Sequence, residues 1–387
     1  MSDMNKEGWE VKKLGEVGDI ITGSTPKTSN KNNYNSDDYC FIKPSDFNGN
    51  LKNLYDSEFY ISEYAYNKSR KLPIDSVLVT CIGTIGNVAI NKVECATNQQ
   101  INSIIPNNDV LSTFLAYSII SKKKYLQFIA NAPVVPIINK SRFSDIPIPI
   151  PPLNTQSAIV AELDSLHRLK ELQEQQLEEY DKLAQSTFYA MFGDPIENEK
   201  GWEVKKLGEI ADCFIGVTYK PENVSTKGSI VLRSGNIQDF ELDLSKDIVK
   251  INKSISNKYY VEDNDILMCS RNGSARLVGK CAKIKDVPLK TTFGAFMTLI
   301  KSQYYEYLFG FFRTDGFRVQ LGTSATTTVN QITLIMLRNI YLPLPPLSLQ
   351  TQFAQRIEKI EVQKELVKQS IAQTEQLINY TMDKYFG

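Results

Sequence analysis

The sequence contains the same pattern twice, and this repeat constrains the fold more than any other feature. Gly8-Trp-Glu-Val-Lys-Lys-Leu-Gly-Glu16 recurs without change at residues 201–209. Ile148-Pro-Ile-Pro-Pro-Leu153 has its counterpart in Leu342-Pro-Leu-Pro-Pro-Leu347, 194 residues further on. A chain of 387 residues is also longer than an ordinary single domain of about 100–200 residues. We therefore expect two copies of one structural unit.

Each copy has the same order of segments: a divergent stretch, a proline-rich turn and a long helix. Because the turn prolines lack an N–H and have a fixed φ, we expect the first helix to begin near Asn154, with Ser348 as the N-cap candidate in the second copy. The divergent stretches share landmarks, since residues 43–47 align with 233–237 and residues 75–83 with 265–273. We assign residues 1–150 to a first variable domain, 151–193 to a first conserved helical region, 194–341 to a second variable domain and 342–387 to a second conserved helical region.

The two helices carry residues at alternating steps of four and three, the spacing of a coiled-coil seam. The second seam consists of Phe353, Ile357, Ile360, Lys364, Val367, Ile371, Thr374, Ile378 and Thr381. The first consists of Ile159, Leu163, Leu166, Lys170, Gln173, Leu177, Tyr180, Ala184 and Thr187. The two seams align position for position. Each stripe needs a partner, so we expect the two helices to form a two-helix coiled coil.

A lysine interrupts both seams at the same position, as Lys170 and Lys364. A polar residue there can fix the register and the partner number of a coiled coil at some cost in stability. Alternatively, each lysine extends its ammonium group out of an ordinary packed helix into water. Both interpretations remain open at this point.

The variable domains have the patterns of mixed α/β structure. Alternating runs at residues 76–81 and 265–269 predict strands. Apolar residues at helical spacing predict one helix within residues 110–130 and one within 304–319. The predicted fold is therefore two mixed α/β domains joined by two long α-helices, with an internal pseudo-two-fold repeat.

Composition gives weaker indications. The N-terminus lacks the apolar stretch of a signal peptide, no segment is apolar enough to span a membrane, and the six cysteines form no Cys-x-x-Cys pair, so we expect reduced core thiols and a cytoplasmic location. The net charge is zero, but residues 1–150 and 192–341 together carry four more basic than acidic residues. Any affinity for nucleic acid must come from locally arranged groups or from partner subunits.

Motifs for catalysis are missing. The one histidine, His167, is predicted to be a solvated helix residue, which argues against histidine-based acid–base or zinc chemistry. Residues 273–281 resemble a phosphate-binding loop, but the spacing of the glycines is wrong and Cys281 replaces the magnesium-binding hydroxyl. No Asn-Pro-Pro-aromatic tetrapeptide or methyltransferase-type glycine-rich turn is present. We therefore expect a non-catalytic chain without a cofactor of its own.

Several motifs in a fixed order resemble one family. They are the Gly8-Trp9 opening, Ile21-Thr-Gly-Ser-Thr-Pro26, Gly83-Thr-Ile-Gly86, Thr97-Asn-Gln-Gln100 and the duplicated Pro-rich turn and helix. Across nearly the whole chain, this order resembles the specificity subunits of type I restriction-modification systems.

The resemblance implies target-recognition domains that each bind one half-site of a split double-stranded DNA target, and helices that pack antiparallel as a ruler. It also implies two methylation subunits with S-adenosylmethionine, restriction subunits with ATP and Mg²⁺, and no membrane. The second half departs from the motif at Gly216-Val-Thr-Tyr-Lys220, and it has Arg271-Asn272 where the alignment gives Cys81-Ile82 in the first half. These departures suggest a different half-site.

Polar loop residues suited to phosphates or base edges are the DNA-binding candidates. They are Lys27, Lys43, Asn98, Gln99, Gln100, Asn139 and Lys140 in the first domain, and Lys220, Arg233, Arg271 and Asn272 in the second. For each of them, an ordinary solvated side chain is an equally good interpretation. The competing function is a coiled-coil scaffold whose repeated domains bind protein partners.

Overall fold

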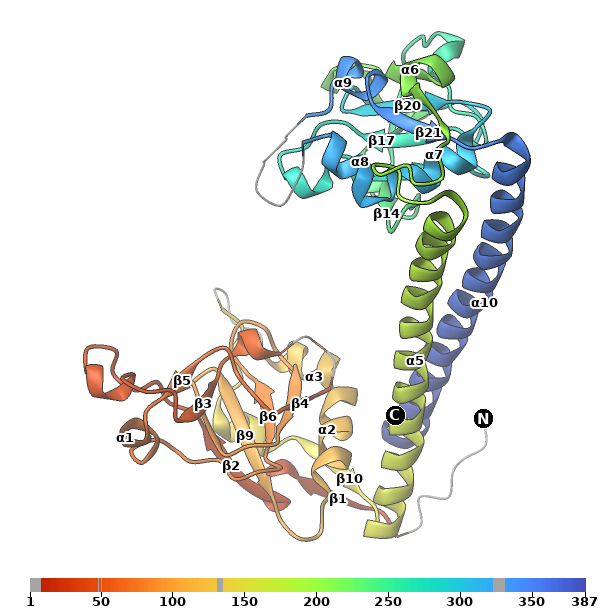
Figure 1. The fold of residues 1–387 in the computed structure, drawn as a ribbon. Coiled ribbons are helices and arrows are strands. Elements are labelled where there is room, and N and C mark those ends of the chain that lie inside the picture. The colour runs from red at the N-terminus through yellow and green to blue at the C-terminus, as the bar shows by residue number, and fades with distance from the viewer. Residues whose placement is uncertain (1–7, 48, 50, 131–134, 323–330) are drawn as a thin grey trace. The chain divides into compact units, whose positions relative to one another are not determined.

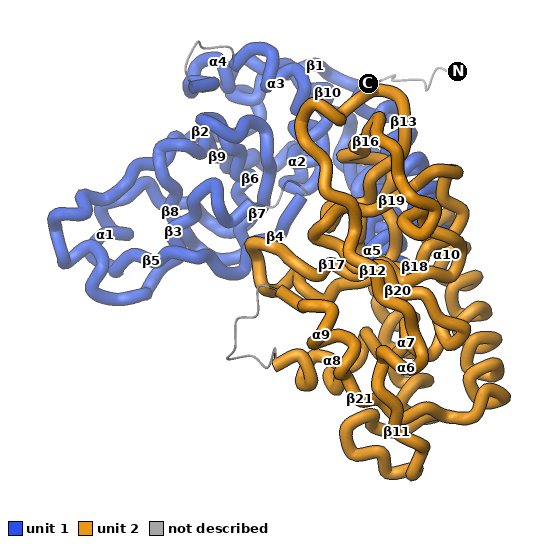
Figure 2. The backbone as a smooth tube through the Cα atoms, turned by 90° about the horizontal axis from the view of Figure 1, so that it is seen from above, with its two compact units in different colours: residues 1–173, 370–387 blue, residues 174–369 orange. Residues whose placement is uncertain are grey.

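The computed structural model describes residues 8–47, 49, 51–130, 135–322 and 331–387. The chain divides into two compact units, Met1–Gln173 with Ser370–Gly387, and Glu174–Gln369 (Figure 2). The two long helices, α5 (Leu153–Phe192) and α10 (Leu347–Phe386), contribute to both units. Each unit therefore combines one variable domain with part of each conserved helix.

The described residues of the first unit form three sheets. The largest has five strands in the order β2 (Gly18–Thr22), β9 (Ile101–Pro106), β6 (Val77–Thr80), β7 (Val88–Asn91) and β4 (Lys52–Leu54). A second has the order β5 (Tyr60–Ile61), β3 (Tyr39–Ile42) and β8 (Cys95–Thr97). The repeated motif forms β1 (Glu10–Lys13), which pairs antiparallel with β10 (Pro147–Ile150) from the Pro-rich turn. The two conserved ends of the repeat thus close the unit.

Helices α2 (Ser112–Ser121), α3 (Lys123–Ile129) and α4 (Lys140–Ser144) follow the strands, and α1 (Glu63–Tyr66) lies between β5 and β6 in sequence (Figure 1). The single helix expected within residues 110–130 is therefore two. The break falls at Lys122, whose φ of −85° and ψ of 4° leave the helical region.

The second unit repeats this order. Its main sheet is β12 (Asp212–Ile215), β20 (Met297–Lys301), β17 (Ile266–Cys269) and β18 (Cys281–Lys283). Its smaller sheets are β16 (Val249–Ile251), β13 (Val224–Leu232) and β19 (Thr291–Phe293); β14 (Ile237–Gln238) with β15 (Glu241–Leu242); and β11 (Glu203–Lys206) with β21 (Tyr341–Leu344). Its helices are α6 (Leu207–Ile210), α7 (Tyr305–Phe312), α8 (Asp315–Gln320) and α9 (Leu334–Arg338). Here too the single helix expected within residues 304–319 is two, because the Thr314 side chain caps a new helix by accepting a hydrogen bond from Phe317 N.

The two predicted strands, β6 and β17, are buried on both faces. Val77 and Val79 belong to the core that includes α2, whereas Leu78 belongs to the core on the opposite face of the sheet. In β17, Ile266 and Leu267 divide in the same way. The strands themselves were predicted correctly, but their alternating pattern does not mark a solvent-exposed face.

The seam residues of both helices are buried or half-buried, as the heptad pattern predicts. In the first unit, Gln173 Nε2 donates to Ser370 Oγ at 2.8 Å and Tyr385 Oη donates to Glu162 Oε2 at 2.6 Å. As residue numbers fall along α5 they rise along α10, so the helices run antiparallel. Helix α5 begins at Leu153, as expected for a start near Asn154, whereas the N-cap candidate Ser348 lies one residue inside α10 rather than before it.

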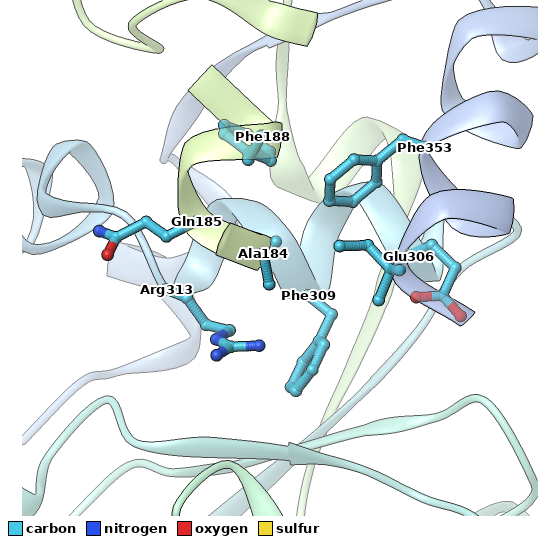
Figure 3. Close-up of a pocket in the computed structure, with 9 residues that line it drawn as sticks. Ala184, Gln185, Phe188, Glu306, Phe309, Arg313 and Phe353 are labelled. Atoms are coloured by element: carbon cyan, nitrogen blue, oxygen red, sulfur yellow. The ribbon is translucent and has the colours of Figure 1, made fainter. Parts of the chain in front are cut away.

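In the second unit, α7 packs against both long helices at a glycine. A Cβ added to Gly310 would lie 2.8 Å from Phe188 Cδ2 and 3.1 Å from Phe353 Cζ. The two phenylalanine rings meet edge to face, 5.8 Å apart, beside a small pocket with a volume of about 20 Å³ (Figure 3). Only a residue without a side chain allows α7 to approach this closely.

All six cysteines are buried free thiols, as expected for core residues. No helix among the described residues is both long enough and apolar enough to cross a membrane.

Candidate nucleic-acid interface

The ends of four strands meet in the first unit and bring most of the candidate residues together. Asn98 N donates to Ile42 O at the end of β3, and Ser24 N donates to Thr97 O at the end of β8. Cys81 N, just after β6, donates to Gln100 O at 2.7 Å. We call these ends, with the segments 23–27, 43, 81–87, 98–100 and 135–140, the first rim. The backbone ladder of the two sheets positions this rim.

Three candidate side chains of the first rim have structural partners. Asn98, 6% exposed, accepts from Gln100 N at 3.0 Å and donates to Gln100 Oε1 at 2.8 Å. Lys43 places its ammonium group 3.1 Å from the centre of the Phe59 ring, a cation–π contact. Asn98 therefore shapes the turn that carries the neighbouring Gln99.

Gln99 is the exposed amide of that turn. Its Oε1 accepts a hydrogen bond from Thr25 Oγ1 at 2.7 Å, which ties the β8–β9 turn to the loop after β2. Lys27 is also exposed on this loop, and its carbonyl oxygen accepts from Asn33 Nδ2 at 2.9 Å. The Gln99 NH₂ group and the Lys27 ammonium group are thus available to an external acceptor.

Asn139 and Lys140 join the same rim from the far end of the domain sequence. Ile138 N donates to Cys81 O at 2.9 Å, so this segment lies beside the loop that follows β6. The Asn139 side chain accepts from Arg142 N at 2.9 Å and caps α4. Asn139 therefore stabilises a helix start, whereas Lys140 is exposed and available.

A basic corner lies beside the first rim, and of its cations only Lys140 was among the candidates predicted from the sequence. Residues 121–142 contain Lys122, Lys123, Lys124, Lys140 and Arg142 and no acidic residue. Lys123 Nζ donates to Asn87 Oδ1 at 2.8 Å, which connects the corner to the loop of residues 81–87. Phe128 on α3 is 73% exposed. The net charge of the whole first domain is close to zero, so it does not reveal this basic segment, although the segment can be read directly from the sequence.

The second unit has a rim of the same construction. Gly294 N donates to Leu232 O at 2.9 Å, Ser270 N to Phe296 O at 2.9 Å, and Ile332 N to Ser270 O at 2.7 Å. They correspond, in the same order, to three bonds of the first rim: Asn98 N to Ile42 O, Cys81 N to Gln100 O, and Ile138 N to Cys81 O. We call the ends of β13, β17 and β19, with residues 233–234, 270–274 and 294–296, the second rim.

The match between the rims corrects the alignment of the two halves by one residue. The carbonyl that accepts from Ile332 belongs to Ser270, and the one that accepts from Ile138 belongs to Cys81. The isolated bridges Arg271–Gln331 and Ile82–Ile137 agree with this correspondence. Arg271 therefore stands where the first unit has Ile82, and Phe296 stands where it has Gln100. Sequence comparison alone placed Arg271 opposite Cys81.

The second-rim candidates differ in how freely they can bind. Arg233 Nη2 donates to Asp247 O at 2.9 Å. The arginine is half-buried and directly precedes a short 3-10 helix, Ser234–Asn236. Arg233 N donates to Asn236 Oδ1 at the end of that helix. Asn272 Nδ2 donates to Ser234 Oγ at 3.1 Å. Arg271 is exposed and its guanidinium lies over the Phe296 ring, 5.5 Å from its centre. Arg271 is thus the more available of the two cations, Arg233 and Arg271.

Lys220 lies on the loop after β12 and is exposed. Its ammonium group is 3.7 Å from Glu222 Oε1, a contact between two highly exposed side chains. An ion pair between two exposed side chains contributes little to stability, and the lysine can leave it at little cost in free energy. Lys220 is therefore accessible but is not joined to the second rim by any hydrogen bond among the described residues.

The seam lysines each face a carboxylate on the opposite helix of the same unit. Lys170 Nζ lies 2.6 Å from Glu375 Oε1, and Lys364 Nζ lies 3.1 Å from Asp181 Oδ1. Burial alone would lower the pKa of Lys364, but Glu361, Asp181 and Glu241 raise it above its ordinary value. Lys364 is therefore a buried, charged and paired group rather than a side chain extended into water.

A groove of about 920 Å³ in the second unit lies between the β14–β15 hairpin and α10. Eight acidic and five basic side chains line it, so its charge does not suit a polyanion.

The described residues contain no group of three or more His, Cys, Asp or Glu side chains that could hold a metal ion. His167 is an exposed residue of α5, as expected; its ring stacks on that of Tyr117 with the centroids 5.7 Å apart, and partial burial lowers its pKa.

The duplicated α/β unit, with a rim of polar side chains on each copy, is the architecture of a modular binding protein with two separate surfaces. The family model described as the type I restriction modification DNA specificity domain matches residues 6–180 and 199–376. The chain belongs to this family, and it contains the domain twice.

Relatives with known names agree with this assignment. The MjaIX specificity subunit of Methanocaldococcus jannaschii is 34% identical over 52% of this chain and 51% of its own length. The HindI specificity subunit of Haemophilus influenzae is 37% identical over 37% of this chain and 32% of its own length. The chain thus covers about half or less of these two relatives. The EcoKI specificity subunit of Escherichia coli is 24% identical over 92% of this chain and 82% of its own length.

Two solved structures share the fold. The type I restriction-modification S subunit from M. genitalium has a TM-score of 0.55 at 13% identity, over 100% of this chain and 98% of the other. A chain from a study of complex assembly and conformational transition of the type I system has a TM-score of 0.64 at 18% identity, over 98% of both chains.

Proposed function

We propose that this chain is the DNA-recognition subunit of a type I restriction-modification complex and binds a two-part target, one half-site at each rim. The observation that carries the proposal is one rim architecture built twice with different side chains. The first rim offers amides and the second offers an arginine on an aromatic ring. A shared backbone frame with different readout groups is what recognition of two unrelated half-sites requires.

In this proposal the chain supplies sequence readout and phosphate contacts, and it is non-catalytic and holds no cofactor. Methyl transfer from S-adenosylmethionine is the task of two methylation subunits. Cleavage that depends on ATP and Mg²⁺ is the task of restriction subunits.

The decisive experiment compares the purified chain with the chain plus its cognate methylation subunit. The chain alone should transfer no methyl group to DNA, and the complex should modify one two-part motif in genomic DNA. Methyl transfer by the rigorously purified chain, or a complex without sequence preference, would contradict the proposal.

A protein-binding coiled-coil scaffold is the alternative. It predicts that the complex forms without any salt-dependent shift of DNA. The basic corner at residues 121–142 favours DNA, because five cations without a carboxylate attract a polyanion.

A further inference from the structure

We infer that Arg271 recognises a guanine in one half-site and that Phe296 positions its guanidinium for this contact. The inference rests on the proposed DNA-recognition function and adds the identity of a base. Nothing in the family match or in the relatives assigns a role to either residue.

The first step concerns how the two side chains are anchored. Ser270 N and Arg271 N both donate to Phe296 O, at 2.9 and 3.1 Å. The adjacent residues Cys269 and Met297 are partners in the β17–β20 ladder. Arg271 and Phe296 therefore leave the edge of one rigid sheet at a fixed separation.

The second step concerns the orientation of the guanidinium. Its carbon lies 5.5 Å from the centre of the Phe296 ring, and no described residue accepts a hydrogen bond from it. Stacking on a ring restrains a guanidinium while leaving all five N–H groups free. The neighbouring Arg233, by contrast, already donates to Asp247 O. Arg271 is thus oriented without using its donors.

The third step concerns what such a group recognises. A planar fork of free donors matches the O6 and N7 acceptors of guanine, the commonest specific contact of arginine in the major groove. Phe296 is 60% exposed, so the face of the guanidinium and the ring are both accessible to a base edge. The first rim has Ile82 and Gln100 at the matching positions, so it cannot make this contact. The guanine must therefore belong to a single half-site.

The test uses the full chain with its methylation subunit, whose target motif is first determined by sequencing methylated genomic DNA. Binding is then measured with duplexes that carry each base at each position of the motif. The variants are R271A, R271K, F296L and F296Y, with Y55L as the matched control, an exposed aromatic residue of the other unit that follows β4 at the end of the sheet opposite the first rim. Thermal unfolding checks that every variant is folded.

We expect R271A and R271K to lose roughly 10- to 100-fold discrimination in favour of guanine at one position, with the other half-site unchanged. R271K keeps the charge but lacks the fork, so its loss identifies a bidentate contact. F296L should lose part of the same discrimination, while F296Y, which keeps the ring, should retain it. Y55L should change no base preference.

Three results would overturn the inference. Equal loss of affinity by R271A for all sequences would make Arg271 a phosphate contact. A motif in which R271A alters no guanine preference would exclude the base assignment, and full discrimination in F296L would exclude the positioning role. A wild-type complex that binds no two-part motif would instead refute the proposed function itself.

Discussion

Lys364 Nζ lies 3.1 Å from Asp181 Oδ1 across the helix pair of the second unit, with 6% of the lysine side chain exposed. In the first unit, Lys170 and Glu375 form the same contact at 2.6 Å with the roles of the two helices exchanged. An offset of 194 residues converts Lys170 into Lys364 and Asp181 into Glu375. The repeat therefore preserves an ion pair between the helices as well as a lysine, which favours a role in setting the register.

The two pairs should differ in their contribution to stability. D181A leaves a buried ammonium group with only the more distant Glu361 and Glu241, at 3.6 and 3.8 Å, and should cost more, up to about 3 kcal/mol. E375A exposes a lysine that is already 27% accessible and should cost less than about 1 kcal/mol. Urea unfolding of both variants checks the order. Equal losses would show that burial of the lysine does not matter.

Gly310 should be intolerant of even one methyl group. G310A places a Cβ within 2.8 Å of Phe188 and should destabilise the chain by about 1–3 kcal/mol through overpacking. G273A is the control, because no atom lies within 4 Å of its added Cβ. Calorimetric melting curves of the two variants test this. A G310A melting temperature equal to that of G273A would mean that α7 can move away from the long helices without cost.

Neutralising the basic corner should weaken DNA binding without altering the target. K122A/K124A should lower the slope of log K against log salt by about 0.9 for each phosphate that the variant no longer neutralises, and should leave the methylated motif unchanged. K92A is the control, since Lys92 follows β7 at the end opposite Asn87 and pairs with Asp75. Titration of labelled duplex at several salt concentrations measures the slope. A changed motif would assign these lysines to base recognition instead.

Asn98 and Gln99 should have different roles in the first rim: Asn98 stabilises the turn, and Gln99 contacts a base. N98A removes the buried turn bonds to Gln100 and should lower stability by about 1 kcal/mol as well as disturb one half-site. Q99A should leave the unfolding free energy unchanged and relax a single base preference, because the exposed amide suits adenine. Paired unfolding and binding measurements distinguish the two effects. A destabilised Q99A with normal base preference would reverse the assignment.

The cysteines should be inert in the folded chain. Burial raises the pKa of the Cys81 and Cys281 thiols to about 12 and raises that of Cys95 as well. A raised thiol pKa contributes stability that is complete below the unfolded value of about 8.5 and is lost as the pH rises toward 12. Aromatic disulfide reagents at pH 8 should label all six thiols only after denaturation. Rapid labelling of native protein would contradict their burial.

The duplication, the seams and the family follow from the order of residues along the chain. These features depend on local spacing: a heptad needs only the helical period, and the Pro-rich turn needs only the missing N–H groups of its prolines. Local patterns also place Lys43, Gln99, Arg233 and Arg271 in loops that the structure assigns to two rims. The helix breaks at Lys122 and Thr314 escaped prediction, because an uninterrupted apolar pattern does not show where a capping bond starts a new helix.

Long-range packing, by contrast, determines which loop residues share a surface and which are already occupied. Asn98 and Asn139 satisfy backbone groups, Arg233 binds a carbonyl, and Arg271 keeps its donors free, although all four are polar loop residues in the sequence. The pairing of Arg271 with Phe296 also depends on strands β17 and β20, whose register brings residues 25 positions apart together. Hydrogen-bond partners across a sheet are set by the register of distant strands, and a linear pattern of residue types does not encode them one position at a time.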